Sequence, residues 1–476
     1  MKFPVFLFAI FLLFVFPGKS AVTDRVVHIS GEAPGYAGEE LVFYSWTDQV
    51  SFTEREIFSF KVDSNDRFSA EFVIEDDLLY VFANSGRNYL YMYLEPGKRY
   101  QVVLPPKTNR SLHESMNPYF EGVPTHLAVV SHDSTELNAI IRSFDNMYEP
   151  VFGDPLIMGS AEDIRNRRAD QIIEQIDSSF SWVSHPYFDT YRNYKIGLLK
   201  NIAGISSARI ISDLYFRHEP VKYDNVAYME LFNQVYNRYF LFFSRTVRGS
   251  RIFDDINKRR SITSLMNTLE TDTVLGRDRL LELVVLKGLH DAFYDSEFSR
   301  SGLLVVLDSL AGRSVFPEHV KIASYIRDKV TRLLKGFKPP EFELRNRDGE
   351  IQSLSDFKGQ YVYLNFCTAA SYSCLAEYEM LKRINDEHGD YLRIVTVFID
   401  NSYQSMPAFL KKNDYDWDFL FYGDQPHVLK DYDVRMFPTY YLIDRDGTLL
   451  MSPAPSPAEE FESYLMKTMR SRGEFR

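Results

Sequence analysis

The spacing of apolar residues changes twice along this chain, and each change predicts a different kind of secondary structure. In residues 21–106, short aromatic and β-branched runs alternate with period two, which is typical of half-buried strands. In residues 107–335, apolar residues recur every three or four positions, which predicts helices. In residues 336–476, strand-like and helix-like segments alternate, which predicts an α/β domain with a partly parallel sheet. We therefore expect a small antiparallel β-sandwich, a mostly helical region and an α/β domain.

Individual strands and helices can be placed within these regions from their apolar runs. The strands expected in the first region are Arg25–Ser30, Glu40–Trp46, Ile57–Val62, Arg67–Val73 and Tyr89–Leu94. The helices expected in the second are Ile164–Ile176, Tyr191–Tyr215, Tyr228–Phe243, Leu280–Phe293 and Val320–Leu334. The third region should contain strands at Tyr361–Phe366, Leu392–Ile399 and Thr439–Ile443, and helices at Cys374–Asn385, Met406–Lys412 and Glu459–Met469.

Residues 1–20 have the features of a secretory signal peptide. Lys2 gives a positive start, Phe3–Phe16 is a nearly unbroken apolar run, and the small residues Gly18 and Ser20 precede a cleavage point at Ala21. The alternative is a membrane anchor, but a span needs about 20 apolar residues. No cysteine lies near the cleavage point, which argues against a lipoprotein anchor. We therefore expect a periplasmic or secreted protein with no membrane span after cleavage.

The composition argues against several classes of function. The chain has 54 Lys and Arg against 66 Asp and Glu, a net charge of −12, whereas nucleic-acid binding needs a basic face. The ten histidines are scattered without ligand spacing, and no phosphate-binding loop or dinucleotide fingerprint occurs, so we expect no metal site and no cofactor. Only two cysteines are present, so the fold must rest on its apolar core rather than on a disulfide framework.

Several short motifs follow one another in the third region in a definite order. They are Pro340–Leu344, Arg347–Glu350, Leu354–Gly359, Tyr363–Phe366, Asp400, Phe437–Thr439 and Tyr441–Gly447. In this order and spacing, residues 337–469 resemble the thioredoxin fold and, within it, the TlpA/ResA branch of exported thiol–disulfide proteins. The whole chain is similar to multi-domain TlpA-like proteins of Bacteroidetes-type bacteria. The resemblance implies a member of the thiol–disulfide oxidoreductase family that acts in cell redox homeostasis.

The active loop of that family reads Trp-Ala-x-Trp-Cys-x-x-Cys-x-x-Glu, and this chain departs from it. Aligned without a gap, Ser371 stands where the attacking cysteine belongs, and Cys374 stands where the resolving cysteine belongs. Cys367 and Ala370 replace the two tryptophans. Because a serine hydroxyl ionises far too weakly to attack a disulfide near neutral pH, this degenerate loop cannot run the usual dithiol cycle. The resemblance also implies that Glu377 is a proton acceptor near Cys374.

The residues leave three interpretations of the cysteines open. Both thiols could be small core residues, since free cysteine packs as a hydrophobe. Cys367 and Cys374 could instead form a disulfide, which an exported protein can keep. Finally, Cys374 could act alone, as in the related peroxiredoxins, although Cys367 stands in place of that family's proline and no arginine follows Pro438. The resemblance implies that the second cysteine position of the motif is buried and less acidic than the first, so we expect Cys374 alone to be a poor nucleophile.

The resemblance implies that Phe437 and Pro438 form one side of a substrate groove. In the family this proline is cis and presents backbone to the extended chain of a bound partner, although it could serve here only to shape the loop. We therefore expect an exported protein that binds an exported polypeptide or an envelope protein and has weak or no dithiol activity. The alternative is an active oxidoreductase that uses Cys367 and Cys374, or a peroxidase that uses Cys374.

Overall fold

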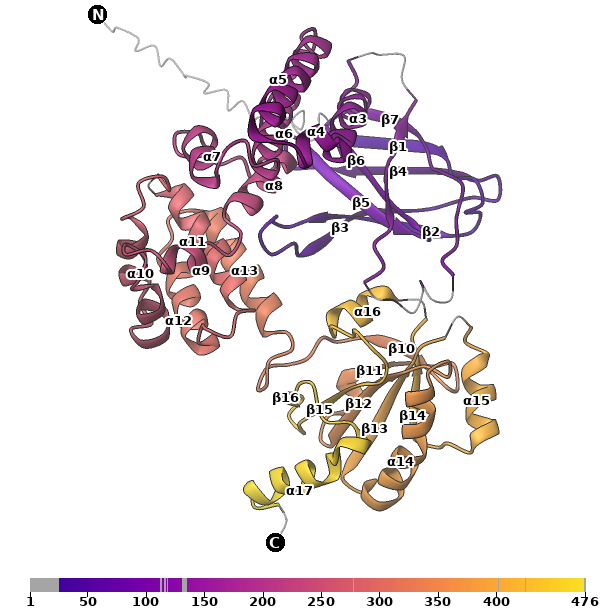
Figure 1. Ribbon diagram of the computed structural model, residues 1–476. Coiled ribbons are helices and arrows are strands. Elements are labelled where there is room, and N and C mark those ends of the chain that lie inside the picture. Colours follow the sequence, from indigo (N-terminus) through magenta and orange to yellow (C-terminus); the bar gives the residue numbers. More distant parts are fainter. Residues whose placement is uncertain are drawn as a thin grey trace, which may run out of the picture.

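The computed structural model describes residues 25–474 except 112–113, 115–116, 118, 131–134, 277, 401 and 424. The predicted signal peptide therefore lies outside the described residues. Figure 1 shows a strand-rich unit, a group of helices beside it and a second strand-rich unit below. None of the helices within the described ranges is long and apolar enough to cross a membrane.

The first unit is a sandwich of two sheets, as predicted. Its strands are β1 (Val26–Glu32), β2 (Glu40–Trp46), β3 (Glu54–Lys61), β4 (Arg67–Val73), β5 (Leu79–Ser85), β6 (Asn88–Leu94), β7 (Arg99–Val103), β8 (Val123–His126) and β9 (Ala128–Val129). One sheet has the order β4-β1-β7-β9 and the other, here called sheet B, has the order β3-β2-β5-β6-β8. Most pairs are antiparallel, but β1 pairs with β7 and β6 pairs with β8 in parallel, which differs from the predicted antiparallel sandwich.

The sandwich extends further along the chain than the predicted boundary at residue 106. The loop after β7 returns to add β8 to sheet B and β9 to the other sheet. Helix α3 then begins at Leu137. The short edge strand β8 contains Pro124 and His126 and lacks a clear apolar alternation, so its sequence does not distinguish it from a loop.

The helical region follows. Its α-helices are α3 (Leu137–Tyr148), α4 (Pro155–Met158), α5 (Glu162–Ser179), α6 (Pro186–Ile202), α7 (Ala208–Tyr215), α8 (Val226–Val235), α9 (Tyr239–Ser244), α10 (Ile262–Leu269), α11 (Arg279–Ala292), α12 (Arg300–Ala311) and α13 (Pro317–Thr331). Two predicted helices are each divided in two. The predicted helix at 191–215 is interrupted near Gly204, and the one at 228–243 at Arg238; both residues adopt a positive φ that ends a helix.

The C-terminal unit contains a seven-stranded sheet in the order β11-β10-β14-β13-β12-β15-β16. Its strands are β10 (Glu343–Asn346), β11 (Ile351–Ser353), β12 (Tyr361–Cys367), β13 (Leu392–Phe398), β14 (Asp418–Phe421), β15 (Thr439–Ile443) and β16 (Leu449–Met451). Its helices are α14 (Tyr372–His388), α15 (Ser405–Asn413), α16 (Pro426–Asp431) and α17 (Phe461–Ser471). The core residues of α14, α15 and α17 pack on one face of the sheet, and those of α16 pack on the other. The predicted thioredoxin-like fold is confirmed.

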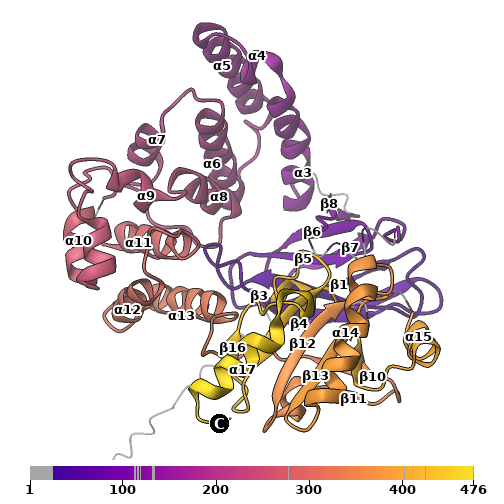
Figure 2. The same ribbon diagram turned by 60° about the horizontal axis from the view of Figure 1, so that its bottom comes forward.

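Helix α16 connects the C-terminal unit to both other units. Lys430 Nζ lies 2.6 Å from Glu54 Oε1 on β3 of the sandwich. Asp431 forms an ion pair with Arg332, which directly follows α13. Figure 2 shows the C-terminal unit in front of the sandwich, so the two units are neighbours in both views.

The segment that follows α16 makes a further contact with the sandwich unit. The Tyr119 hydroxyl donates a hydrogen bond to Asp433, and the Arg435 guanidinium lies over the Tyr119 ring, 5.5 Å from its centroid. Tyr119 belongs to the long connection between β7 and β8. The chain between α16 and β15 is therefore held against the rest of the protein on its way to Pro438.

Candidate functional site

The candidate site lies where β12 ends and α14 begins. Ser371 is the N-cap of α14, and its Oγ accepts a hydrogen bond from the backbone N–H of Cys374 at 3.4 Å. Serine suits this position because its side-chain oxygen satisfies one of the helix N–H groups that have no partner within the helix. The hydroxyl at the attacking position is thus used to cap the helix.

The fold brings the two cysteines together. Both are free thiols with no exposed surface, although they come from a strand and a helix. Cys374 Sγ also accepts a hydrogen bond from the backbone N–H of Thr368 at 3.4 Å. The two thiols contact each other through a side-chain hydrogen bond. A disulfide between them stays a prediction.

The two thiols have opposite pKa shifts. Hydrogen bonding from the Cys367 side chain, and then from the Thr368 N–H and the Ser371 hydroxyl, lowers the pKa of Cys374 despite its burial. Burial raises the pKa of Cys367 well above its ordinary value, and the contact with Cys374 raises it further. Cys374 is buried, as expected, and its pKa lies below that of an ordinary thiol. Burial therefore limits the access of a substrate to this thiol.

Glu377, the predicted proton acceptor, is half-buried on the first turns of α14. Its Oε2 accepts a hydrogen bond from the Tyr440 hydroxyl at 2.6 Å, and the Tyr440 ring stacks on Tyr363 of β12 with centroids 4.9 Å apart. The Glu377 charge acts to raise the pKa of Cys374. Sequence reasoning did not identify Tyr440, because nothing in the run Thr439–Ile443 distinguishes this tyrosine from a core residue.

The peptide bond between Phe437 and Pro438 is cis, in agreement with the resemblance. Because Phe366 pairs with Thr439 in antiparallel register, the chain at Pro438 lies beside the end of β12, where Cys367 stands. Apolar side chains around this loop are exposed, and they form what we call the apolar rim: Tyr372 (86%), Met436 (71%) and Leu375 (41%). None of these three was singled out from the sequence.

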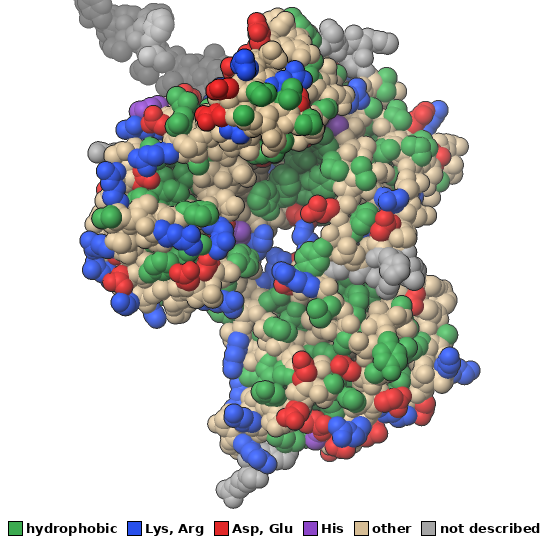
Figure 3. All heavy atoms as spheres, in the orientation of Figure 1, with side chains coloured by type: hydrophobic (Ala, Val, Ile, Leu, Met, Phe, Trp, Pro, Cys, Tyr) green, Lys and Arg blue, Asp and Glu red, His purple; other side chains and the backbone are tan. Residues whose placement is uncertain are grey.

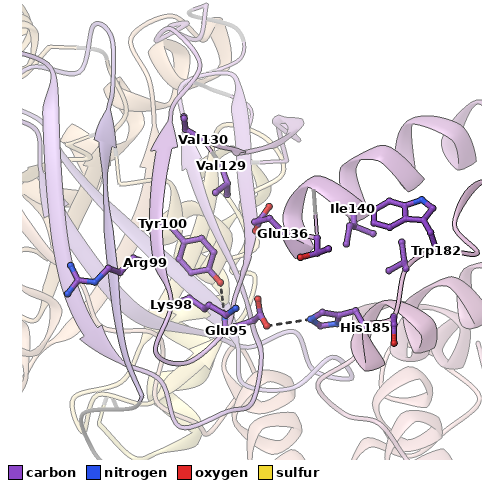
Figure 4. Close-up of a pocket in the computed structure, with 13 residues that line it drawn as sticks. Glu95, Lys98, Arg99, Tyr100, Val129, Val130, Glu136, Ile140, Trp182 and His185 are labelled. Carbon is purple, nitrogen blue, oxygen red and sulfur yellow. Dashed lines mark hydrogen bonds and ion pairs between the residues drawn. The ribbon is translucent and has the colours of Figure 1, made fainter. Parts of the chain in front are cut away.

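Two further features lie away from this loop. A cavity of about 460 Å³ is bounded by the β6–β7 turn, the start of α3 and the residues before α6, and Figure 4 shows its lining. Its acidic groups are already used: Glu95 pairs with His185 at 3.4 Å, and Glu136 caps α3. Glu387, His388 and Glu462 lie close enough to hold a metal ion, but Glu462 already pairs with Arg383. The loop between β12 and α14 therefore remains the candidate site.

Comparison with known proteins agrees with this geometry. The AhpC/TSA family matches residues 336–451. The chain is 29% identical over 150 residues to the thioredoxin-like protein YneN of Bacillus subtilis, which covers 31% of this chain and 83% of that protein. It is 25% identical over 168 residues to the thiol-disulfide oxidoreductase ResA of Bacillus cereus, covering 35% of this chain and 92% of that one.

Solved structures align with the same share of the chain. The thioredoxin domain of a thiol-disulfide oxidoreductase from Bacteroides vulgatus is 22% identical, with a TM-score of 0.27 and coverage of 28% of this chain and 98% of that one. The thiol:disulfide interchange protein DsbE of Chlorobium tepidum is 24% identical, with a TM-score of 0.27 and coverage of 29% and 98%. On the sequence matches, the C-terminal unit is a thioredoxin-like domain of the AhpC/TSA class. Its relatives are thiol–disulfide oxidoreductases of the TlpA/ResA type.

Proposed function

We propose that this protein is an exported member of the thiol–disulfide oxidoreductase family that binds polypeptides, or an envelope protein, without running a dithiol cycle. The observation that carries the proposal is a difference in exposure around the loop between β12 and α14. Both thiols have no exposed surface, whereas the apolar rim beside cis-Pro438 is open to solvent. The surface that would receive a chain is present, and the group that would attack a disulfide is absent.

The state of Ser371 supports the loss of the dithiol cycle. That cycle needs a thiolate at the attacking position and a second thiol that releases the mixed disulfide. The Ser371 hydroxyl cannot supply the first of these, and it is engaged with the N–H of Cys374. Cys374, the remaining thiol of the motif, has no surface through which a protein disulfide could reach it without a local opening.

The apolar rim supports the binding role. Large apolar side chains that cluster on a surface often mark an interaction site, whereas single ones need no explanation. Tyr372 and Leu375 lie on the first turn of α14, and Met436 lies on the cis-proline segment. A chain bound along the cis-proline would bury these side chains and contribute favourable apolar contact.

Peptide binding and disulfide reduction should be measured on the same mature protein. A fluorescein-labelled apolar peptide should bind by fluorescence anisotropy, and Met436→Ser should weaken that binding. Val315→Ser is the matched control, because Val315 is 81% exposed in the helical region. Reduction of a model disulfide should stay at the background rate. Equal effects of the two variants, or turnover that disappears in Cys374→Ala, would contradict the proposal.

A second candidate function is dithiol chemistry by the Cys367 and Cys374 pair, which their contact and the lowered pKa of Cys374 favour. The Cys374 thiolate would attack a substrate disulfide and release one substrate thiolate. Cys367, after losing its proton, would then attack Cys374 Sγ and release the second thiolate. The products would be a Cys367–Cys374 disulfide and a reduced substrate, so turnover would need an external thiol reductant. Loss of two free thiols on oxidation, measured by thiol titration, would support this route.

A further inference from the structure

The outer face of sheet B is aromatic where a solvated sheet face would be polar. One face of the sheet builds the sandwich core, with Phe43, Val81 and Met92 among its residues. The alternate positions of the same strands point the other way. Tyr44 pairs with Phe82, and Phe82 pairs with Tyr91, so these rings form a row across three strands. We call the outward set the aromatic wall: Tyr44, Trp46, Tyr80, Phe82, Tyr89 and Tyr91.

The helical region covers part of this face, since Tyr80 and Tyr91 pack against its core. Asn233 of α8 also donates a hydrogen bond to the Gln49 carbonyl in the β2–β3 turn at 2.7 Å. Tyr93, at the end of β6, is buried against Tyr187 and Tyr191 of α6. Except for the buried Phe82, the rings of the aromatic wall stay half-buried. Figure 3 shows a hollow lined with hydrophobic side chains between the helical region and the sandwich, above the thioredoxin-like domain. The aromatic wall is therefore continuous with the interface to the helices, and part of it remains uncovered.

The thioredoxin-like domain contacts sheet B at its edge strand β3, beside the aromatic wall. Glu54 pairs with Trp46 across β2 and β3, so their side chains share the outer face of sheet B. Lys430 of α16 contacts Glu54 at 2.6 Å. The chain then runs from α16 to Met436 and Pro438. One short segment thus links the aromatic wall to the groove of the proposed function.

The arrangement of the rings favours one kind of occupant. Trp46 and Tyr80 are stacked 5.3 Å apart at 20°, and Phe82 and Tyr89 are stacked 5.3 Å apart at 23°. In each of these pairs one ring therefore covers a face of the other. Ring edges and CH groups suit apolar side chains, whereas a sugar ring needs an open aromatic face. The exposed carboxylate of Glu56 lies opposite Tyr44 and adds a negative charge beside the rings.

We propose that the aromatic wall binds an extended, unfolded polypeptide segment that has apolar side chains at alternate positions and a flanking lysine or arginine. Alternate side chains of an extended chain point the same way, so every second one would contact the aromatic wall. The basic residue would pair with Glu56. This inference rests on the proposed function, because it makes the aromatic wall and the cis-proline groove two parts of one binding surface.

Binding of a designed peptide to the full mature protein tests the inference. The probe is a fluorescein-labelled peptide in which Phe and Ser alternate between terminal lysines, and the matched peptide has Ser in place of Phe. Trp46→Ala should weaken binding of the first peptide about tenfold, which is typical of an aromatic anchor. Trp182→Ala is the control, because Trp182 is 56% exposed and lies on the helical region rather than on sheet B.

A second variant distinguishes weaker binding from a loss of folding in Trp46→Ala. Phe52 is 41% exposed and meets the Trp46 ring edge-on at 5.3 Å, and its φ of 53° is a conformation that asparagine tolerates. Phe52→Asn should therefore remove an exposed ring without straining the backbone, and it should weaken binding severalfold.

The outcomes separate the inference from the proposed function. Weaker binding in Trp46→Ala and Phe52→Asn, with Trp182→Ala unchanged, supports the aromatic wall. If only Met436→Ser weakens binding, the inference is overturned and the proposed function stands. If the intact protein does not bind the peptide, both fail. If maltoheptaose binds in place of the peptide and is lost in Trp46→Ala, the occupant is a glycan and the inference is overturned.

Discussion

Replacing Ser371 with cysteine should restore disulfide reductase activity. The N-cap position would then carry a thiol at the N-terminus of α14, where backbone N–H groups and the helix dipole stabilise a thiolate. Cys374 would lie three residues further along the helix, as in the Cys-x-x-Cys motif. The loop would again hold an attacking and a resolving thiol.

The thiolate fraction of the introduced cysteine sets the expected activity, and loss of the serine cap sets the expected change in stability. An ordinary thiol with a pKa near 8.5 is about 3% ionised at pH 7, whereas one with a pKa near 7 is about half ionised. The half-buried position of residue 371 leaves the introduced sulfur accessible, unlike that of Cys374. Loss of the serine cap should lower the free energy of unfolding by about 0.5–2 kcal/mol. We therefore expect turnover from a slightly less stable protein.

The assay is reduction of a model disulfide in the presence of an excess of reductant, with urea unfolding measured in parallel. The control is the double variant Ser371→Cys with Cys374→Ala. Mixed with the model disulfide in the absence of reductant, it should form a mixed disulfide in a single stoichiometric step, because no resolving thiol remains. A folded single variant whose new thiol reacts with a small alkylating agent but does not turn over would refute this account of the loop.

Three other predictions follow from the pKa shifts and the N-terminal sequence. Alkylation should begin at lower pH at Cys374 than at Cys367 in the protein that keeps both cysteines, measured by mass spectrometry of the two labelled sites, because their pKa values shift in opposite directions. Burial raises the pKa of Asp145 to about 6, so between about pH 4 and 6 the folded state holds a proton that the unfolded state has lost, and stability falls as the pH rises. Asp145→Asn, which keeps an acceptor for the Tyr191 hydroxyl, should therefore raise the free energy of unfolding at pH 7 by about 2–3 kcal/mol in urea titrations. Mass spectrometry of the exported protein should find Ala21 at its N-terminus; an intact Met1 would refute cleavage.

Much of the fold could be predicted from apolar spacing alone. The predicted strand Arg67–Val73 coincides with β4, because its alternation is regular and turn residues precede it. Strand β5 was missed because Leu79–Ser85 is apolar on both faces, which removes the alternation. That double-sided pattern exists because sheet B buries one face in the sandwich and turns the other toward the helices and the hollow. A pattern read along one strand cannot reveal such an arrangement.

The candidate site was predictable only in part. The order of motifs located Ser371 and Pro438, and the preference of serine for N-caps is a local property of the sequence. The lowered pKa of Cys374 depends on Thr368 and Cys367, which the fold brings to it from the end of β12. The aromatic wall likewise depends on strand order, which joins side chains from β2, β5 and β6. Both features depend on which residues the fold brings together, and residue types along the chain do not reveal this.

The contacts of α16 have a consequence for the movement of the domains. The Lys430–Glu54 and Arg332–Asp431 pairs are partly exposed, and pairs of this kind each contribute at most about 1 kcal/mol. Raising the ionic strength from 0.1 to 1 M shortens the screening length from about 10 to about 3 Å and weakens them further. Such a tenfold rise in salt would weaken the attachment of α16 to the sandwich and to the end of α13. Because the segment after α16 leads to Pro438, a shift of α16 would also change the position of the cis-proline groove relative to the sandwich.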